Sequence, residues 1–188
     1  MRKLLKAVCD IQRFLKKRGI PYMIIGGIAN LVWGEPRTTL DIDITVSIPQ
    51  KEVKSFIDEV DKKFRILVHD PEEFVKKTHV LPIETDSIRI DVIFAGLDYE
   101  KEAIKRALDV EVEEGIKVRV CAPEDLIIYK AVSERERDWE DIEGILLRSG
   151  ERLDMEYLIP RIKELSAILE KPEIFEKFNR LIEKTSSL

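Results

Sequence analysis

The segment Leu40–Val46 reads Leu-Asp-Ile-Asp-Ile-Thr-Val, and its alternation of apolar and polar residues predicts a β-strand. Side chains two residues apart in a strand project to the same face, so Asp41 and Asp43 should lie side by side, with Cα atoms roughly 6.5 Å apart. The apolar residues of the segment, Leu40 included, should face the other side of the sheet and be buried there. The segment therefore predicts a sheet that carries two neighbouring carboxylates on one face.

Two carboxylates on one strand need a physical reason, because they repel each other and Asp is depleted in strands. A cation between them removes the repulsion. Oxygen ligands on a rigid element suit Mg²⁺, which binds through one or two carboxylates, water and substrate phosphates. The alternative is an edge strand that shows both side chains to solvent. We interpret Asp41 and Asp43 as ligands of Mg²⁺ or Mn²⁺.

A third carboxylate lies in the next strongly alternating segment, Ile88–Phe94, which also predicts a strand. Asp91 is flanked there by apolar residues that face away from it. If the two strands are neighbours in the sheet, Asp91 completes a cluster of three carboxylates able to hold two metal ions roughly 4 Å apart. The alternative is that Arg89, which shares the face of Asp91, is simply its ion-pair partner.

Two further features precede the paired carboxylates. Gly26 and Gly27 follow a short apolar run, and glycines at a turn from strand to helix let the backbone approach an anion. Taken alone, the pair could be only a tight turn. Arg37, Thr38 and Thr39 come just before Asp41 and could bind phosphate through a guanidinium and two hydroxyl groups. Arg37 could equally serve to neutralise the acidic pair.

The remaining pattern predicts an α/β (α+β) fold, a mixed β-sheet flanked by helices, with a C-terminal helical region. We place the α/β domain at residues 1–121 and the helical region, packed on it, at 122–188. Apolar spacing predicts helices at 2–18, 28–33, 49–60, 99–108, 123–147, 154–169 and 172–185. Strands are predicted at 22–25, 40–46, 64–68, 79–83, 88–94, 110–113 and 116–120.

The predicted helix at 123–147 carries a charged stripe opposite an apolar one. At about 100° per residue, Lys130, Arg137 and Asp141 fall on one side of a continuous helix. Such a stripe is usually no more than a solvated face. Arg135 falls on the apolar side, and the pattern offers no reason for it.

Composition narrows the class of protein. The chain has 188 residues, enough for one well-buried core, and a formal net charge of −5, which argues against a general nucleic-acid coat. Two separated cysteines and two histidines make a conventional zinc site improbable. No apolar run reaches the roughly 20 residues of a membrane span, so we expect a cytoplasmic protein with no membrane partner. Many Lys, Glu and Arg beside two Gln and two Asn suggest a thermophilic source.

The residues quoted above resemble the core motif of the nucleotidyltransferase superfamily that includes DNA polymerase beta. In this chain the motif reads Gly-Gly, a short helix, Asp-x-Asp on a strand and a later strand Asp. The segment Arg37-Thr38-Thr39, the segment Ala122-Pro123-Glu124-Asp125-Leu126, and Lys130 with Arg137-Asp138 and Asp141 are also similar to the toxin-type branch, the abortive-infection nucleotidyltransferases. The resemblance covers roughly residues 20–147. The family's common Gly-Ser pair is Gly-Gly here, so one serine hydroxyl contact to phosphate is missing.

The resemblance implies a metal-dependent, pyrophosphate-releasing enzyme that transfers a nucleoside monophosphate from an NTP to an acceptor hydroxyl. It implies Asp41, Asp43 and Asp91 as catalytic metal ligands, and Gly26, Gly27, Arg37, Thr38, Thr39, Lys130, Arg137 and Asp141 as nucleotide-binding residues. The acceptor could be tRNA, protein or a small molecule, and an antitoxin protein is a possible partner. The competing hypothesis is a degenerate module of the same fold that binds nucleotide or a partner without catalysis.

Overall fold

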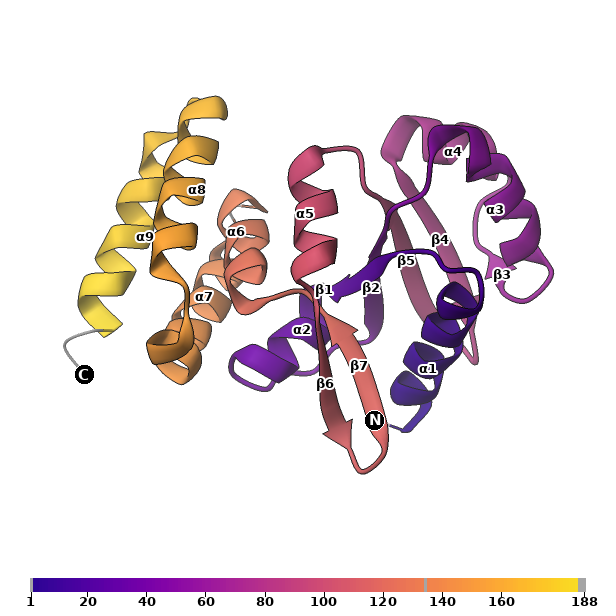
Figure 1. Ribbon diagram of the computed structural model, residues 1–188, viewed down its shortest axis with the longest axis horizontal. Coiled ribbons are helices and arrows are strands. Elements are labelled where there is room, and N and C mark those ends of the chain that lie inside the picture. Colours follow the sequence, from indigo (N-terminus) through magenta and orange to yellow (C-terminus); the bar gives the residue numbers. More distant parts are fainter. Residues whose placement is uncertain (1, 134, 186–188) are drawn as a thin grey trace. The chain divides into compact units, whose positions relative to one another are not determined.

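A computed structural model describes residues 2–133 and 135–185 of the chain (Figure 1). The chain forms two compact units. The first contains the residues up to Ile28 together with Thr38–Cys121, and the second contains Ala29–Arg37 together with the chain from Ala122 onward. Each unit has its own apolar core, and we describe each by itself.

The first unit is built on a seven-stranded mixed sheet. Its strands are β1 (Tyr22–Ile25), β2 (Asp41–Val46), β3 (Arg65–Ile66), β4 (Val80–Thr85), β5 (Ile88–Phe94), β6 (Leu108–Glu113) and β7 (Ile116–Val120). The strand order is β3-β4-β5-β2-β1-β7-β6, in which β2 pairs with β5 and β1 with β7 in parallel. The other neighbours are antiparallel. The strands that carry the three predicted carboxylates are therefore adjacent.

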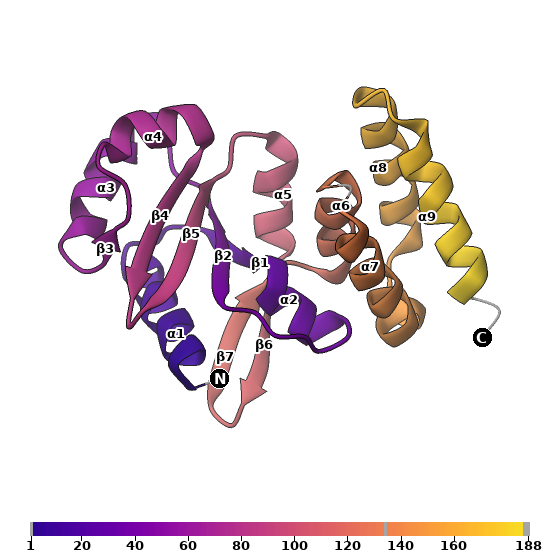
Figure 2. The ribbon, with the colours of Figure 1, turned by 180° about the vertical axis from the view of Figure 1, so that it is seen from behind.

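Helices of the first unit pack on this sheet. They are α1 (Arg2–Lys17), α3 (Val53–Asp61), which follows a 3₁₀ turn at Gln50–Glu52, α4 (Pro71–Thr78) and α5 (Asp98–Arg106). Helix α1 contacts β2, β5 and β7, and α5 contacts β1 and β2. Figure 1 shows α3 and α4 beside the β3–β4 edge, and Figure 2 shows the same sheet from behind.

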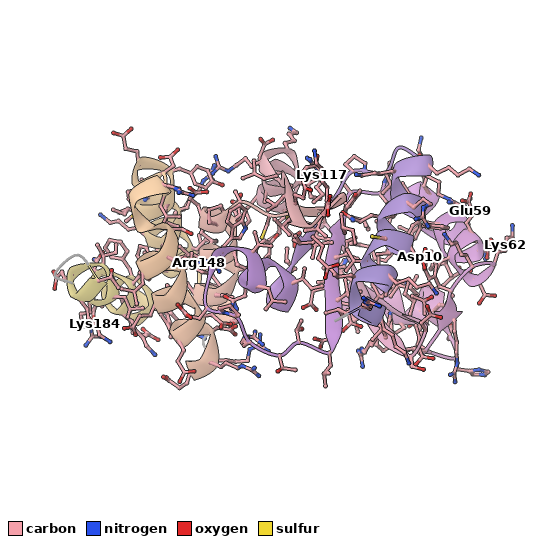
Figure 3. All side chains as sticks on the ribbon, turned by 90° about the horizontal axis from the view of Figure 1, so that it is seen from below. Asp10, Glu59, Lys62, Lys117, Arg148 and Lys184 are labelled. Carbon is pink, nitrogen blue, oxygen red and sulfur yellow. The ribbon has the colours of Figure 1, made fainter. Side chains whose placement is uncertain are left out.

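The core of the first unit follows the sequence periodicities. Helix α1 buries its apolar stripe and ends before Gly19, whose φ of 64° is the left-handed conformation favoured by glycine. Strand β2 buries Ile42, Ile44 and Val46, and Thr45 between the last two is buried as well. The core consists of side chains with almost no exposure: Val8, Ile11, Leu15, Met23, Ile24, Ile42, Ile44, Leu81, Ile83, Ile90 and Val92. Figure 3 shows charged side chains such as Glu59 and Lys62 at the periphery.

The second unit is helical. It contains α6 (Pro123–Ser133), α7 (Glu136–Ser149), a 3₁₀ turn at Gly150–Arg152, α8 (Met155–Ile168), α9 (Pro172–Thr185) and all but the first turn of α2 (Gly26–Trp33). Helix α8 begins where the Asp154 carboxylate accepts a hydrogen bond from the backbone N–H of Tyr157. The core of the unit includes Leu126, Ile127, Ile142, Ile145, Leu158, Ile162 and Phe178. The α+β class with a C-terminal helical region is confirmed.

Two expectations about local structure are wrong. The predicted single helix at 123–147 is two helices, because Arg135 adopts an extended backbone (φ −72°, ψ 137°) and α7 starts after it; Glu134 lies outside the described residues. Leu40 is not buried but 78% exposed, because β2 begins only at Asp41 and leaves Leu40 in the connecting segment. Among the described residues, no helix combines the length and hydropathy that crossing a membrane requires.

Candidate active site

The parallel pairing of β2 with β5 brings the predicted carboxylates together. In this register Asp43 lies beside Asp91, and Asp41 lies beside Arg89. Adjacent strands are about 4.8 Å apart, and residues two apart on a strand share a face. These four residues therefore occupy one face of the sheet. We call Asp41, Asp43 and Asp91 the carboxylate cluster.

Gly26 and Gly27 lie directly against two side chains of the site, Asp43 and Thr39. Gly26 has a φ of 62°, and a Cβ built on it would lie 2.0 Å from Oδ2 of Asp43. A Cβ on Gly27 would lie 2.4 Å from Oγ1 of Thr39. Any side chain at either position would therefore displace a polar group of the site. Helix α2 begins at Gly26, so its first backbone N–H groups lack helical acceptors and suit an anion.

Each outer carboxylate of the cluster has a neighbour that holds it. Oγ1 of Thr39 lies 3.1 Å from Oδ1 of Asp41, a hydrogen bond that the hydroxyl donates. Nε of Arg89 donates to Oδ1 of Asp91 at 2.9 Å. Thr38 is exposed. Of the predicted lead-in residues, Thr39 therefore contacts a carboxylate of the cluster.

The charge of the cluster acts on Arg89. The pKa of Arg89 is raised above its ordinary value, mainly by the hydrogen bond to Asp91 and the charge of that carboxylate. The charges of Asp41 and Asp43 raise it further. Arg89 therefore lies within the electrostatic reach of all three acids. This is the ion pair that the sequence left open as the alternative role of Asp91.

The donor set suits a hard divalent cation in its chemistry, since it consists of carboxylate oxygens on two rigid, adjacent strands. In their present positions, however, no three His, Cys, Asp or Glu side chains of residues 2–133 and 135–185 converge as a ready metal site. One oxygen of Asp91 is held by Arg89 instead. Asp41, Asp43 and Asp91 would be the ligands of a bound metal, and Arg89 would compete with that metal for Asp91.

The second unit holds a different charged group, which we call the buried ion cluster: Arg37, Lys130, Asp138 and Asp141. Nζ of Lys130 lies 3.0 Å from Oδ1 of Asp138 and also donates to Oδ2 of Asp141. Nε and Nη2 of Arg37 donate hydrogen bonds to the carboxylate oxygens of Asp141, at 3.1 to 3.2 Å. Lys130, Asp138 and Asp141 are almost fully buried. Arg37 thus binds a carboxylate of α7.

The break between α6 and α7 explains which charged residues meet. Lys130 is on α6 and its two carboxylates are on α7, whereas Arg137 is exposed on the outer side of α7. Of the predicted trio, the structure brings together Lys130 and Asp141 and leaves Arg137 outside.

Asp138 has three donors, since Ser133 and Arg135 also bond to its Oδ2. Burial alone would raise the pKa of Asp138, but the three donors and the charge of Lys130 outweigh it and bring this pKa below its ordinary value. Arg135, which the sequence left unexplained, therefore helps to compensate a buried charge at the start of α7.

Sequence reasoning missed Asn30 altogether. It is fully buried, and its Nδ2 donates to Oδ1 of Asp141 and to the backbone carbonyl of Glu35, both at 3.1 Å. A lone Asn inside the apolar stretch Ile28–Trp33 was the available signal, because a buried amide needs partners. The sequence resemblance includes Asp138, but the phase of a continuous helix favours its neighbour Arg137 as the site residue.

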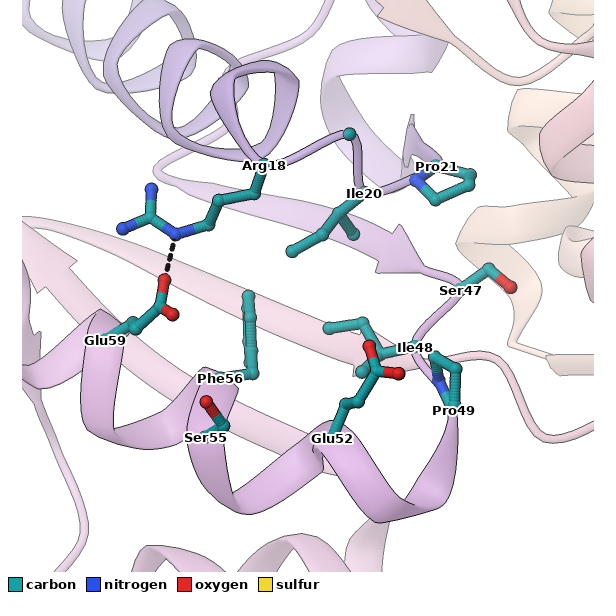
Figure 4. A pocket seen from close by; sticks show the side chains of 11 residues that line it. Arg18, Ile20, Pro21, Ser47, Ile48, Pro49, Glu52, Ser55, Phe56 and Glu59 are labelled. Carbon is teal, nitrogen blue, oxygen red and sulfur yellow. Dashed lines mark hydrogen bonds and ion pairs between the residues drawn. The ribbon is translucent and has the colours of Figure 1, made fainter.

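A pocket lies at the other end of β1 and β2. It measures about 330 Å³ and is lined by Arg18, Ile20, Pro21, Ser47, Phe56 and Glu59, among others (Figure 4). Tyr22 pairs with Val46 at this end, whereas Ile25 pairs with Asp43 at the other. Arg18 donates to Glu59 there. The pocket is therefore separate from the carboxylate cluster.

This fold and this face of the sheet define a nucleotidyltransferase-like protein, and comparison gives the family. The chain matches the family model described as "Nucleotidyltransferase of unknown function (DUF6036)" over residues 2–185, so it belongs to that family. The enzyme class implied by the sequence resemblance is thereby confirmed. No curated protein matches the chain significantly.

Several solved structures have a similar fold. A solution structure of the antibiotic-resistance factor ANT(2'')-Ia has a TM-score of 0.60 and 21% identity, over 90% of this chain and 96% of that one. The antigenic nucleotidyltransferase-like protein from Paracoccidioides brasiliensis has a TM-score of 0.54 and 15% identity, over 95% and 93%. The lincosamide antibiotic adenylyltransferase LnuA, with lincomycin bound, has a TM-score of 0.53 and 15% identity, over 74% and 94%. At these identities the likeness shows the fold.

Proposed function

We propose that this protein transfers a nucleoside monophosphate from an NTP to an acceptor hydroxyl, with Mg²⁺ or Mn²⁺ held by Asp41, Asp43 and Asp91. The observation that carries the proposal is the β2–β5 register, which sets Asp43 beside Asp91 on the face that Asp41 shares. Membership of a nucleotidyltransferase family supports it.

The residues of the first unit would divide the work. The Gly26–Gly27 turn would receive the triphosphate on backbone N–H groups, because helix α2 begins there. Asp91 would accept the proton of the attacking hydroxyl. Thr39 would keep Asp41 in one orientation. Positioning and charge neutralisation would supply most of the rate enhancement. A bound divalent metal would supply the positive charge that offsets the phosphate oxygens.

The roles of the other predicted nucleotide-binding residues are part of the same proposal. Thr38 is exposed beside Thr39 and could donate a hydroxyl to phosphate. Arg37, Lys130 and Asp141 are committed to one another in the buried ion cluster, so we expect them to act by ordering the 29–37 segment rather than by direct contact. Arg137 is exposed and remains available to nucleotide.

The acceptor class can be narrowed by experiment. Two proteins of similar fold carry names that refer to antibiotics, and LnuA is named as an antibiotic adenylyltransferase with lincomycin bound. A small hydroxylated molecule therefore stands beside tRNA and protein as an acceptor to test. The four α-labelled NTPs should each be offered to RNA, protein and small-molecule fractions with Mg²⁺ or Mn²⁺. Transfer of label that stops with a chelator is the expected result.

The decisive variants are Asp43→Asn and Asp58→Asn. Asp43→Asn keeps the shape of the side chain but removes a ligand charge, so transfer should fall by orders of magnitude. Without metal, the melting temperature of Asp43→Asn should equal or slightly exceed that of the wild type, because repulsion within the carboxylate cluster is relieved. Asp58 is exposed on α3, and its Asn variant should match the wild type. Full transfer by Asp43→Asn would reject the proposed metal role.

A finer proposal is a toxin-type role with an antitoxin partner. It rests on the similarity of Lys130, Arg137-Asp138 and Asp141 to the toxin-type branch. Expression of the wild type should then slow the growth of a host cell, and Asp43→Asn should not. Growth that is unaffected by an enzymatically active wild type would argue against this role. A protein that binds NTP but transfers no label to any fraction would support the degenerate-module hypothesis.

A further inference from the structure

Arg89 shares the acidic face of the sheet with Asp41, Asp43 and Asp91. Along β5 it bonds to Asp91, and across the β2–β5 pairing it lies beside Asp41. Asp43 is next to Asp91 in the same register. One guanidinium therefore faces three carboxylates, which would repel one another strongly in its absence.

The Arg89–Asp91 ion pair is accessible to solvent on the arginine side. The side chain of Arg89 is 57% exposed, whereas that of Asp91 is 20% exposed. An ion pair with one exposed partner contributes little net stability, since water solvates the guanidinium readily when the pair opens. The carboxylate stays on its strand while the long arginine side chain can move away.

The Arg89–Asp91 bond also disfavours the binding of a metal ion at Asp91. Oδ1 of Asp91 accepts from Nε of Arg89, so the guanidinium and a cation compete for the charge of this carboxylate. A divalent ion brings twice the charge of the guanidinium to the same three carboxylates. It can therefore replace Arg89 without leaving the acids uncompensated.

We propose that Arg89 is an internal counter-cation of the carboxylate cluster, which holds Asp91 in the metal-free protein and yields it when a divalent metal binds. This inference rests on the proposed function, because it takes the carboxylate cluster to be the metal site. Arg89 is a positioning residue here. It keeps Asp91 oriented and limits repulsion, at the expense of competing with the metal.

The test is Mn²⁺ binding without NTP, measured by calorimetry on the full chain. Arg89→Gln removes the competing charge and keeps a polar side chain of similar reach. Mn²⁺ should bind about 2- to 5-fold more tightly to this variant, the range expected when a weak, partly exposed ion pair no longer has to open. The melting temperature of Arg89→Gln without metal should be lower than that of the wild type. Mn²⁺ should raise the melting temperature of the variant more than it raises that of the wild type.

Arg13→Gln is the matched control. Arg13 also forms an ion pair in which the arginine is exposed, with Asp10 at 2.8 Å, but on helix α1 rather than on the strands that carry the carboxylate cluster. Its Mn²⁺ affinity should equal that of the wild type. General damage to the sheet would weaken metal binding in Arg89→Gln, so tighter binding is a change that a merely structural role does not produce.

Asp43→Asn separates this inference from the proposed function. If Asp43→Asn abolishes Mn²⁺ binding while Arg89→Gln binds as the wild type does or more weakly, the role of Arg89 is wrong and the metal site stands. If Asp43→Asn binds Mn²⁺ as the wild type does, the metal site itself is wrong and the inference about Arg89 fails with it. If Asp43→Asn loses binding and Arg89→Gln tightens it, both are supported.

Discussion

At the scale of single residues, the missing side chain at Gly26 decides where Asp43 can lie. The carboxylate occupies the space that a Cβ on Gly26 would fill, with 2.0 Å between Oδ2 and the ideal Cβ position. The positive φ of Gly26 adds a second reason for glycine, because other residues pay for this conformation. Backbone conformation and site geometry are thus fixed by one residue.

Gly26→Ala should therefore disturb the site more than the backbone alone explains. We expect a loss of about 1–2 kcal/mol from the left-handed conformation, and a displaced Asp43 that weakens Mn²⁺ binding. Calorimetry and thermal melting measure the two effects separately. Gly19→Ala is the control, since Gly19 has a φ of 64° but nothing within 4 Å of its ideal Cβ. It should lose comparable stability and keep its Mn²⁺ affinity; equal Mn²⁺ affinity in both variants would contradict the steric argument.

Single residues also show what the sequence could predict about the site. Period-two alternation was enough to place Asp41 and Asp43 on one face, because it depends only on local backbone geometry. The bond between Arg89 and Asp91 was foreseen only as an alternative, since both residues share a face whichever partner they choose. The contact of Thr39 with Gly27 could not be predicted, because it depends on how two segments twelve residues apart approach each other.

At the scale of elements, the break after α6 decides how the charges of the second unit are paired. Two short helices let Lys130 lie between Asp138 and Asp141, with Arg37 and Asn30 also bonded to Asp141. A continuous helix would have kept these groups on one stripe facing water. The sequence predicted a single helix because residues 133–136 contain neither Gly nor Pro to mark an end. The pairing of β2 with β5 likewise could not be predicted from local sequence patterns, because it depends on the tertiary structure.

This arrangement predicts how acid acts on the second unit. The pKa of Asp138 lies below its ordinary value of 3.8, so its stabilising effect is fully present above about that pH and is lost as the pH falls through the folded-state pKa. Asp138→Asn should be less stable than the wild type at pH 7, by about 1–3 kcal/mol for a lost hydrogen bond to a charged group. That difference should narrow below pH 4.

Tryptophan fluorescence can follow this transition, because Trp33 and Trp139, the two tryptophans of the chain, belong to the second unit. Urea unfolding at a series of pH values gives the stability of each variant. Glu140→Gln is the control, since Glu140 is exposed on the same helix. Its stability should follow that of the wild type at every pH. A constant gap between wild type and Asp138→Asn from pH 7 to pH 3 would refute the role assigned to the carboxylate.

At the scale of the whole molecule, the chain passes from one unit to the other three times. It leaves the first unit after Ile28, returns at Thr38 and leaves again after Cys121. The excursion at 29–37 is short, and its polar groups bond to α7. The carbonyl oxygen of Gly34 accepts from Arg148 at 2.7 Å, and that of Trp33 accepts from Ser149 at 3.1 Å. The segment that leads into Thr38, Thr39 and β2 is therefore anchored by residues more than 100 positions further along the chain.

A fragment of residues 1–121 tests this dependence. It contains every strand of the sheet and the whole carboxylate cluster, but it lacks each α7 residue that bonds to the 29–37 segment. We expect the amides of β1, β2 and β5 to remain protected from hydrogen exchange, because their ladders are complete within the fragment. The amides of residues 29–37 should exchange far faster than in the full chain, since Asn30 and Arg37 have lost Asp141.

The full chain with Arg148→Met is the control: it removes one anchor and should loosen the segment only in part. Equal protection of residues 29–37 in the fragment and the full chain would show that the segment is ordered by the first unit alone, and would remove the basis for assigning Arg37, Lys130 and Asp141 an ordering role.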